Sequence, residues 1–111
     1  MTDKIVILST CSTEQEAERL ARLLVDEKLA ACVTVIPRIR SFYHWKGVVE
    51  TSDECLLLVK SSRALFEELR VRLEAAHTYE TPELLALPIV EGAPNYMNWL
   101  AGNLRDFPKG E

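Results

Sequence analysis

A single long β-hairpin decides the fold of this chain, and its sequence at positions 31–60 is ACVTVIPRIRSFYHWKGVVETSDECLLLVK. Lys46 and Gly47 separate two runs of apolar and β-branched residues, and Gly47 can adopt the positive φ that a two-residue hairpin turn requires. Pro37 cannot donate a ladder hydrogen bond, which predicts a bulge or an edge position within the first arm. We therefore expect one strand before this turn and a returning strand after it.

The predicted hairpin is too long for one small domain. Each arm has roughly 15 residues and would span about 45–50 Å, whereas typical strands span about 17–20 Å. Phe42, Tyr43 and Trp45, near the tip of the hairpin, would leave a large apolar patch exposed in a monomer. We therefore expect these three residues to form the interface of a closed homo-oligomer, through pairing of strand edges between chains.

Further strands and helices are expected on both sides of the hairpin. Residues 4–11 form a continuous β-branched run typical of a strand buried on both faces, and residues 83–90 predict a short apolar strand at or near the centre of the sheet. Ser12 and Thr13 each stand three residues before a Gln or Glu, and these overlapping capping boxes predict a helix that ends near Lys28.

A second long helix is expected to begin with a cap at Ser61 or Ser62 and to end at His77, and a short terminal helix is expected over 95–104. The resulting order is β-α-β-β-α-β followed by a helix. With right-handed crossovers, this order gives a four-stranded antiparallel sheet with both long helices on one face. The predicted fold class is α+β, a ferredoxin-like plaited sheet, in a single domain over residues 1–111.

Composition indicates an ordinary globular domain. The 111 residues are 48% hydrophobic and 27% charged, with a formal net charge of -4, so there is no basic footprint for nucleic acid. The apolar run near the N-terminus is far too short for a signal-peptide core or a membrane span. We expect a cytoplasmic protein, with no nucleic-acid or membrane partner, whose cysteines at positions 11, 32 and 55 are reduced.

Four segments in this order resemble the CutA divalent-cation tolerance family: LAACV at 29–33, SFYHWKG at 41–47, HTYETPE at 77–83 and YMNWL at 96–100. The resemblance runs over about residues 5–105, and four ordered motifs are far more specific than any one alone. It implies a homotrimer whose hairpins wrap neighbouring subunits, similar in plan to nitrogen-regulatory PII signal proteins. It also implies Cu(II) binding and a role in tolerance to copper and other divalent ions, with no enzymatic reaction.

Two positions depart from the family pattern. Thr78 stands where many members have a proline, so the loop after the second long helix lacks a fixed φ and is expected to be less rigid. Ser9 stands where some members have a cysteine, whereas Cys11 lies two residues further on and faces the same side if the strand continues.

The candidate metal ligands are His77, Cys11, Glu80 and Glu83. A histidine at a helix C-terminus also stabilises the terminal carbonyls, by about 0.3–1 kcal/mol, without any further role. Beside two carboxylates and within the family motif, His77 becomes the best candidate to bind Cu(II) or another divalent metal, which folding does not require. Cys11, next to polar Ser12, is expected to be the cysteine that reaches solvent.

A competing hypothesis is a trimeric signalling or scaffold module that binds a small molecule or a protein in its intersubunit clefts. The candidate ligand-binding residues for that module are Tyr79, Lys60 and Trp99. Cys32 and Cys55 lie in apolar strand contexts and are expected to be inert. Catalysis ranks below binding because no nucleophile adjoins the histidine and carboxylates of the loop, and there is no glycine-rich phosphate loop.

Overall fold

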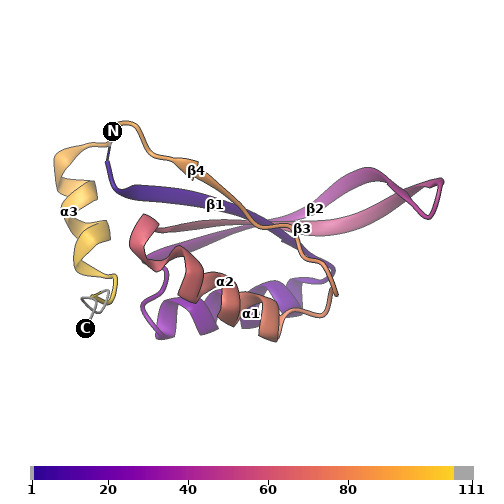
Figure 1. The fold of residues 1–111 in the computed structure, drawn as a ribbon, viewed down its shortest axis with the longest axis horizontal. Helices are drawn as coiled ribbons and strands as arrows, with labels where there is room; N and C mark the ends of the chain where they lie inside the picture. Colours follow the sequence, from indigo (N-terminus) through magenta and orange to yellow (C-terminus); the bar gives the residue numbers. More distant parts are fainter. Residues whose placement is uncertain (1, 107–111) are drawn as a thin grey trace.

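The computed structural model describes residues 2–106, and within them the chain forms an α+β fold (Figure 1). The elements in chain order are β1 (Lys4–Cys11), α1 (Glu14–Asp26), β2 (Cys32–Trp45), β3 (Val48–Ser62), α2 (Phe66–Ala76), β4 (Leu85–Pro88) and α3 (Pro94–Gly102), with a 3-10 turn at Arg63–Leu65 before α2. The βαββαβ order and the terminal helix agree with the order expected from the sequence. None of the helices described in residues 2–106 is long and apolar enough to span a membrane.

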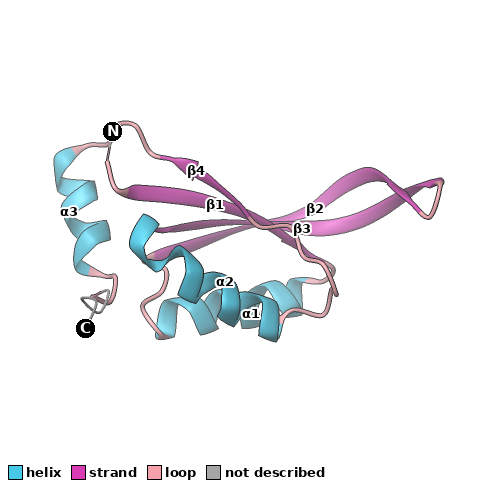
Figure 2. Ribbon diagram, in the orientation of Figure 1, coloured by secondary structure: helices cyan, strands magenta, loops and turns pink. Residues whose placement is uncertain are grey.

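The four strands form one antiparallel sheet in the order β2-β3-β1-β4, and α1 and α2 lie together on one side of it (Figure 2). β4 pairs with β1 alone, so it is an edge strand, and the prediction that it lies at or near the centre is wrong. β4 is apolar although it is an edge strand, because its leucines belong to the apolar side of the sheet away from the helices. Leu85 and Leu87 are 56% and 49% exposed there.

The hairpin projects well beyond the rest of the sheet (Figure 1). β1 pairs with β3 from Ser62 back to Cys55, so within residues 2–106 the strands of the outer part of the hairpin pair only with each other. The predicted bulge lies between Ile36 and Ile39, around Pro37. The predicted turn is also confirmed, with Lys46 at φ 52° and Gly47 at φ 81°.

The helix starts follow local hydrogen bonds. The hydroxyl of Thr13 accepts the backbone N–H of Glu16 at 3.0 Å, which confirms the predicted cap of α1. The predicted serine cap of α2 is wrong, because both serines belong to β3 and a 3-10 turn intervenes before the helix. Ser61 instead donates its hydroxyl to the carbonyl of Leu29 at 2.6 Å, which ties β3 to the connection after α1.

The core lies between the helices and one face of the sheet. Alternate residues of β1 and β3 point into it and are almost fully buried, as the two-residue period of a strand requires. The helices contribute side chains at three- and four-residue spacing. Fully enclosed side chains from these strands and helices include those of Ile7, Leu57, Val59, Leu20, Leu24, Leu69 and Leu73.

The opposite face of the sheet is apolar and is not covered by α1 or α2. The intervening residues of β1 and β3 lie on it, and the register places β4 residues beside them. We call this set the open face: Val6, Leu8, Ile36, Leu56, Leu58, Leu85 and Leu87. The tip of the hairpin adds exposed aromatic rings, with Phe42 70% and Trp45 57% exposed. A lone chain therefore leaves an apolar surface much larger than a monomer normally exposes.

The hairpin turn gives the first testable prediction. Gly47→Ala places a Cβ at a backbone with φ 81°, which costs an L-residue about 1–2 kcal/mol, although a Cβ there meets nothing within 4 Å. Gly102→Ala is the matched control, because that position has equal space and no positive φ. Urea unfolding at one fixed chain concentration should show a clear loss for Gly47→Ala and none for Gly102→Ala. Equal effects of the two changes would contradict the strain at the turn.

Candidate functional site

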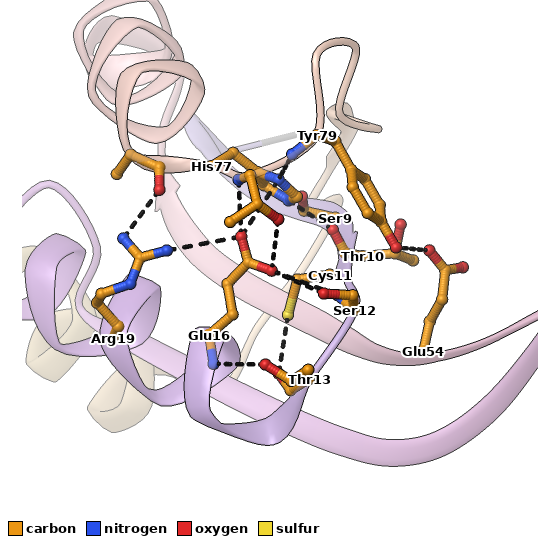
Figure 3. A network of polar contacts seen from close by, with 12 residues as sticks. Ser9, Thr10, Cys11, Ser12, Thr13, Glu16, Arg19, Glu54, His77 and Tyr79 are labelled. Atoms are coloured by element: carbon orange, nitrogen blue, oxygen red, sulfur yellow. Dashed lines mark hydrogen bonds and ion pairs between the residues drawn. The ribbon is translucent and has the colours of Figure 1, made fainter.

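The loop that follows α2 is fastened to the end of β1 through His77 (Figure 3). One ring nitrogen, Nε2, lies 2.7 Å from the carbonyl oxygen of Thr10, and the other, Nδ1, accepts the backbone N–H of Tyr79 at 3.0 Å. A carbonyl can only accept, so these partners assign the ring proton to Nε2. The side chain of His77 is 0% exposed. To reach solvent from this position, the ring would have to break both hydrogen bonds.

A buried carboxylate, Glu16, lies beside this ring. It accepts the backbone N–H and the hydroxyl of Thr78 at 2.8 and 3.0 Å and the hydroxyl of Ser12 at 3.2 Å. It also lies 3.5 Å from Nδ1 of His77 and 3.6 Å from the guanidinium of Arg19. Burial alone would raise the pKa of Glu16, but the hydrogen bonds from the backbone and side chain of Thr78 and from the backbone of Ser12 outweigh it, so the pKa is lowered.

Thr78 holds the entry of the loop through a hydrogen bond of its backbone. Its backbone N–H, which a proline would lack, donates to Glu16. The loop entry was predicted to be less rigid, whereas the structure gives it a hydrogen bond to a buried carboxylate that a proline could not make. From the sequence, Glu16 was expected only to complete a capping box with Thr13. Its position on the buried side of the helix could have indicated more, because a buried carboxylate needs a polar partner from elsewhere in the chain.

Tyr79 completes the attachment of the loop. Its hydroxyl donates to a carboxylate oxygen of Glu54 at 2.6 Å, and its ring lies 4.8 Å from that of His77, centroid to centroid. Burial, followed by the hydrogen bond to Glu54, raises the pKa of Tyr79 well above its usual range. The hydroxyl of Ser9 donates to the carbonyl of Glu83 at 2.7 Å, which holds the far end of the loop. Tyr79, predicted to bind a ligand, already has its polar atom occupied within the chain.

Cys11 is enclosed. It is 0% exposed, its thiol donates to the carbonyl of Thr13 at 3.5 Å, and burial, with smaller effects of Glu16 and Cys55, raises its pKa to about 12. The prediction that it reaches solvent is wrong, because β1 continues to this residue and its position in the register faces the helices. Cys32, expected to be inert, is the partly exposed cysteine.

The predicted metal ligands do not meet in one place. Glu80 and Glu83 are exposed on the loop, whereas His77 and Cys11 are sealed beneath it. Within residues 2–106, no group of three or more His, Cys, Asp or Glu side chains is arranged to hold a metal ion. Of the four predicted ligands, a single chain therefore presents two as accessible carboxylates, and the part that the structure describes holds no complete divalent-cation site.

The predicted ligand-binding residues are also divided between two places. The ammonium of Lys60 lies 5.7 Å from the centroid of the Tyr96 ring, and that ring lies 5.5 Å from the ring of Trp99. Lys60 is paired with Val6 near the start of β1. Tyr79 lies near the other end of that strand, so one chain does not bring it together with Lys60 and Trp99.

Comparison with known proteins gives one consistent family. Residues 5–103 match the family described as CutA1 divalent ion tolerance protein. A divalent-cation tolerance protein CutA from Thermus thermophilus is 45% identical over 98 residues, which are 88% of this chain and 95% of that protein. The protein of the same name from Pectobacterium atrosepticum is 42% identical over 105 residues, 95% of this chain and 96% of its own.

The fold gives the same result. The solved structure of the divalent cation tolerance protein Cut A1 from Thermus thermophilus superposes with a TM-score of 0.90 at 43% sequence identity. The superposition covers 92% of this chain and 99% of that structure.

The network around Glu16 gives the second prediction. Glu16→Gln replaces one acceptor oxygen by an amide NH₂, which opposes the donors of Thr78, and should lower the free energy of unfolding at pH 7 by about 1–3 kcal/mol. Because folding lowers the pKa of Glu16, the wild-type advantage is complete above the unfolded carboxyl value near 4.3 and is lost as the pH falls through the folded value.

Unfolding in urea between pH 7 and pH 3 measures this advantage. Glu18→Gln, at an exposed position of the same helix, is the matched control and should change stability by about 0.5 kcal/mol or less. A stability difference for Glu16→Gln that does not shrink toward low pH would contradict the role of the ionised carboxylate.

Proposed function

Because the chain belongs to the CutA1 divalent ion tolerance protein family, we propose that it binds divalent cations, copper among them, as a homotrimer that acts in tolerance to metal ions. The family match confirms the resemblance of its four motifs. The names of the two bacterial relatives support a divalent cation as the ligand, since both are called divalent-cation tolerance proteins. No enzymatic reaction is part of the proposal. A cytoplasmic location is proposed on the three free thiols, which suit a reducing compartment.

The open face is the observation that supports the proposed trimer most directly. Its apolar side chains come from all four strands, and no described strand of the chain pairs with the outer edges of β2 and β4. A hairpin that extends past its own sheet can pair with the edge of a neighbouring chain, while the open faces pack against one another. Such a head-to-tail contact between copies closes into a ring, and the family resemblance gives that ring three members.

The divalent cation is proposed to bind at the exposed carboxylates of Glu80 and Glu83, with further ligands from a neighbouring chain. Carboxylate oxygens suit divalent ions, and two of them in one chain leave the coordination incomplete. His77 acts in this proposal as a positioning residue. In its neutral form the ring has one lone pair available to a metal, on Nδ1, and the N–H of Tyr79 already uses it. The ring therefore holds the loop that carries the carboxylates.

A second candidate function is the binding of a small anionic molecule, as expected for a PII-like module. It rests on the placement of Lys60 over the ring of Tyr96, with Trp99 beside it and both rings about half exposed. The ammonium of Lys60 can pair with the anionic group of a ligand, and the exposed rings can stack against a flat portion of the same ligand. Calorimetric titration with common anionic metabolites, compared between wild type and Lys60→Ala, separates this candidate from the cation site.

The trimer gives the third prediction. Light scattering should give three times the chain mass at micromolar concentration. Trp45→Ala, which removes a ring from the hairpin tip, should weaken assembly by about 2–4 kcal/mol because a large aromatic anchor is lost. Val71→Ala is the matched control, since Val71 is exposed on α2, away from the hairpin. A monomer mass for the wild type, or equal assembly of Trp45→Ala, would contradict the proposed interface.

The cation site gives the fourth prediction. Calorimetry with Cu(II) and Zn(II) should show saturable binding to the wild type, and the double change Glu80→Gln/Glu83→Gln should weaken it roughly 10- to 100-fold or more, because ligands are lost. The matched control is Glu18→Gln/Glu67→Gln, which removes two exposed carboxylates from the helices. Trimer mass is checked for each variant. Unchanged affinity in the loop variant with an intact trimer would contradict this assignment.

A further inference from the structure

Two buried cysteines, Cys11 and Cys55, lie directly opposite one another across the β1–β3 pair. Both belong to the core side of the sheet, with Cys11 0% and Cys55 3% exposed. Opposed residues of an antiparallel pair have Cα atoms about 4.5 or 5.5 Å apart, which falls within the range of about 4.4–6.8 Å that a disulfide spans. Cys32 is opposite Lys60, which lies about 16 Å along β3 from Cys55 at the usual rise of a strand. The register therefore brings two of the three thiols to a spacing at which they can be joined.

A surface hollow opens onto one of these two thiols. It has a volume of about 340 Å³, lies between the start of α1 and the base of the hairpin, and is lined by Ser12, Thr13, Glu54 and Cys55 among others. A hollow of this size admits a molecule as small as hydrogen peroxide. Cys55 is therefore the thiol that a small oxidant meets first, and Cys11 stands behind it on the neighbouring strand.

We propose that Cys11 and Cys55 are an oxidation site, at which a small neutral peroxide joins the two thiols in a reversible disulfide. The Cys55 sulfur attacks one peroxide oxygen, the O–O bond breaks, and Cys55 becomes a sulfenic acid as one water leaves. The Cys11 sulfur then attacks the Cys55 sulfur, the S–O bond breaks, and the thiol proton leaves with the hydroxide as a second water. Two thiols and one hydrogen peroxide thus give one disulfide and two waters, and the two electrons lost by sulfur reduce the peroxide.

The buried surroundings favour this product over any charged form of the pair. Burial, followed by the charges of Glu16 and Cys55, raises the pKa of the Cys11 thiol to about 12, which keeps it protonated and unreactive toward an oxidant on its own. A disulfide carries no charge, so neither burial nor the neighbouring carboxylates oppose it once it has formed. The second step depends instead on proximity, because the Cys55 sulfur is held on the directly opposed residue.

Closing the bond moves the two strands slightly, which makes the bond reversible. The Cβ atoms of opposed residues lie about 4.5–5.5 Å apart, whereas a disulfide holds them at about 3.5–4.5 Å, so the pair has to be drawn together by about 1 Å. A disulfide formed under such strain is readily reduced. This lability suits a transient, redox-sensing bond in a reducing compartment.

The two cysteines adjoin the two points that hold the loop after α2 (Figure 3). The residue before Cys11 holds His77, since its carbonyl oxygen lies 2.7 Å from Nε2 of the ring. Glu54, the residue before Cys55, accepts the hydroxyl of Tyr79 at 2.6 Å. Drawing the strands together here displaces both anchors against the loop, so oxidation loosens its attachment. The same loop carries the carboxylates of the proposed cation site, and an effect of oxidation on cation binding is the only part of the inference that rests on the proposed function.

The test uses Cys32→Ala as the reference protein, so that the partly exposed third thiol cannot form other disulfides. Treatment with hydrogen peroxide should lower its intact mass by two hydrogen atoms per chain, and a reducing thiol should restore the mass. After unreacted thiols have been blocked, peptide mapping should find Cys11 linked to Cys55. In the same background, Cys11→Ala should stop at a Cys55 sulfenic acid, which dimedone traps.

The wild type provides a measurement that needs no variant to fold, because its peptide map should contain the same link between Cys11 and Cys55. A reference protein that keeps both hydrogens would overturn the proposal. Oxidation of Cys55 to a sulfinic acid without the link, or a link that forms only after the chain has been unfolded in urea, would overturn it as well.

Amide hydrogen exchange tests the effect on the loop. The N–H of Tyr79, which donates to the ring of His77, should exchange faster in the oxidised protein than in the reduced one. The matched control is the N–H of Arg63, which donates to the carbonyl of Asp3 at the other end of β1 and should exchange equally in both forms. Equal exchange of the Tyr79 amide would overturn the loosening of the loop. This readout needs no metal, so absent cation binding alongside faster Tyr79 exchange would contradict the proposed function alone.

Discussion

The register between β1 and β3 is the constraint on which the rest of the structure depends. Their pairing runs from Lys4 opposite Ser62 to Cys11 opposite Cys55 without a shift. Because side chains alternate along a strand, this register decides at once which residues meet the helices and which form the open face. A slip of β1 by one residue against β3 would turn Ile7 to the outside. The same register ends the two-layered part of the fold at Cys55, beyond which the hairpin continues on its own.

The end of β1 is also where the polar chemistry of the chain is concentrated. Glu16, His77 and Tyr79 bring the start of α1, the end of α2 and the following loop onto one strand end. Every buried polar side chain described there has a partner, as a buried network requires if it is to stabilise the fold. The network therefore explains His77 as the anchor of a loop, and it leaves Glu80 and Glu83 exposed on that loop, where the cation site is proposed.

One face of the sheet serves the folding of the chain, and the other serves the proposed assembly. The face under α1 and α2 provides the core of one chain, while the open face and the hairpin tip remain apolar and uncovered. A charge-poor surface of this size is stable in water when a second surface of the same kind meets it. In the proposed trimer, the parts that stabilise one chain and the parts that join chains share the same strands, so folding and assembly are coupled.

The sequence alone determined those features that follow from local chemistry. Thr13 as a helix cap, the bulge at Pro37 and the turn at Gly47 each follow from what a hydroxyl, a missing N–H or a missing Cβ permits at that point of the backbone. The strands and helices, and their order, follow from apolar periodicity. The four motifs determined the family in the same way, because they are local strings that need no structure.

Tertiary structure alone decided where those elements meet. The apolar run at Leu85–Pro88 is typical of a central strand, but it lies at the edge, because an uncovered apolar face produces the same pattern as burial on both sides. The exposure of Cys11 was predicted wrongly for a similar reason. Whether a side chain at the end of an element reaches solvent depends on what other elements cover it. Here Glu16 and the loop after α2, more than 60 positions apart in the chain, close over that end of β1.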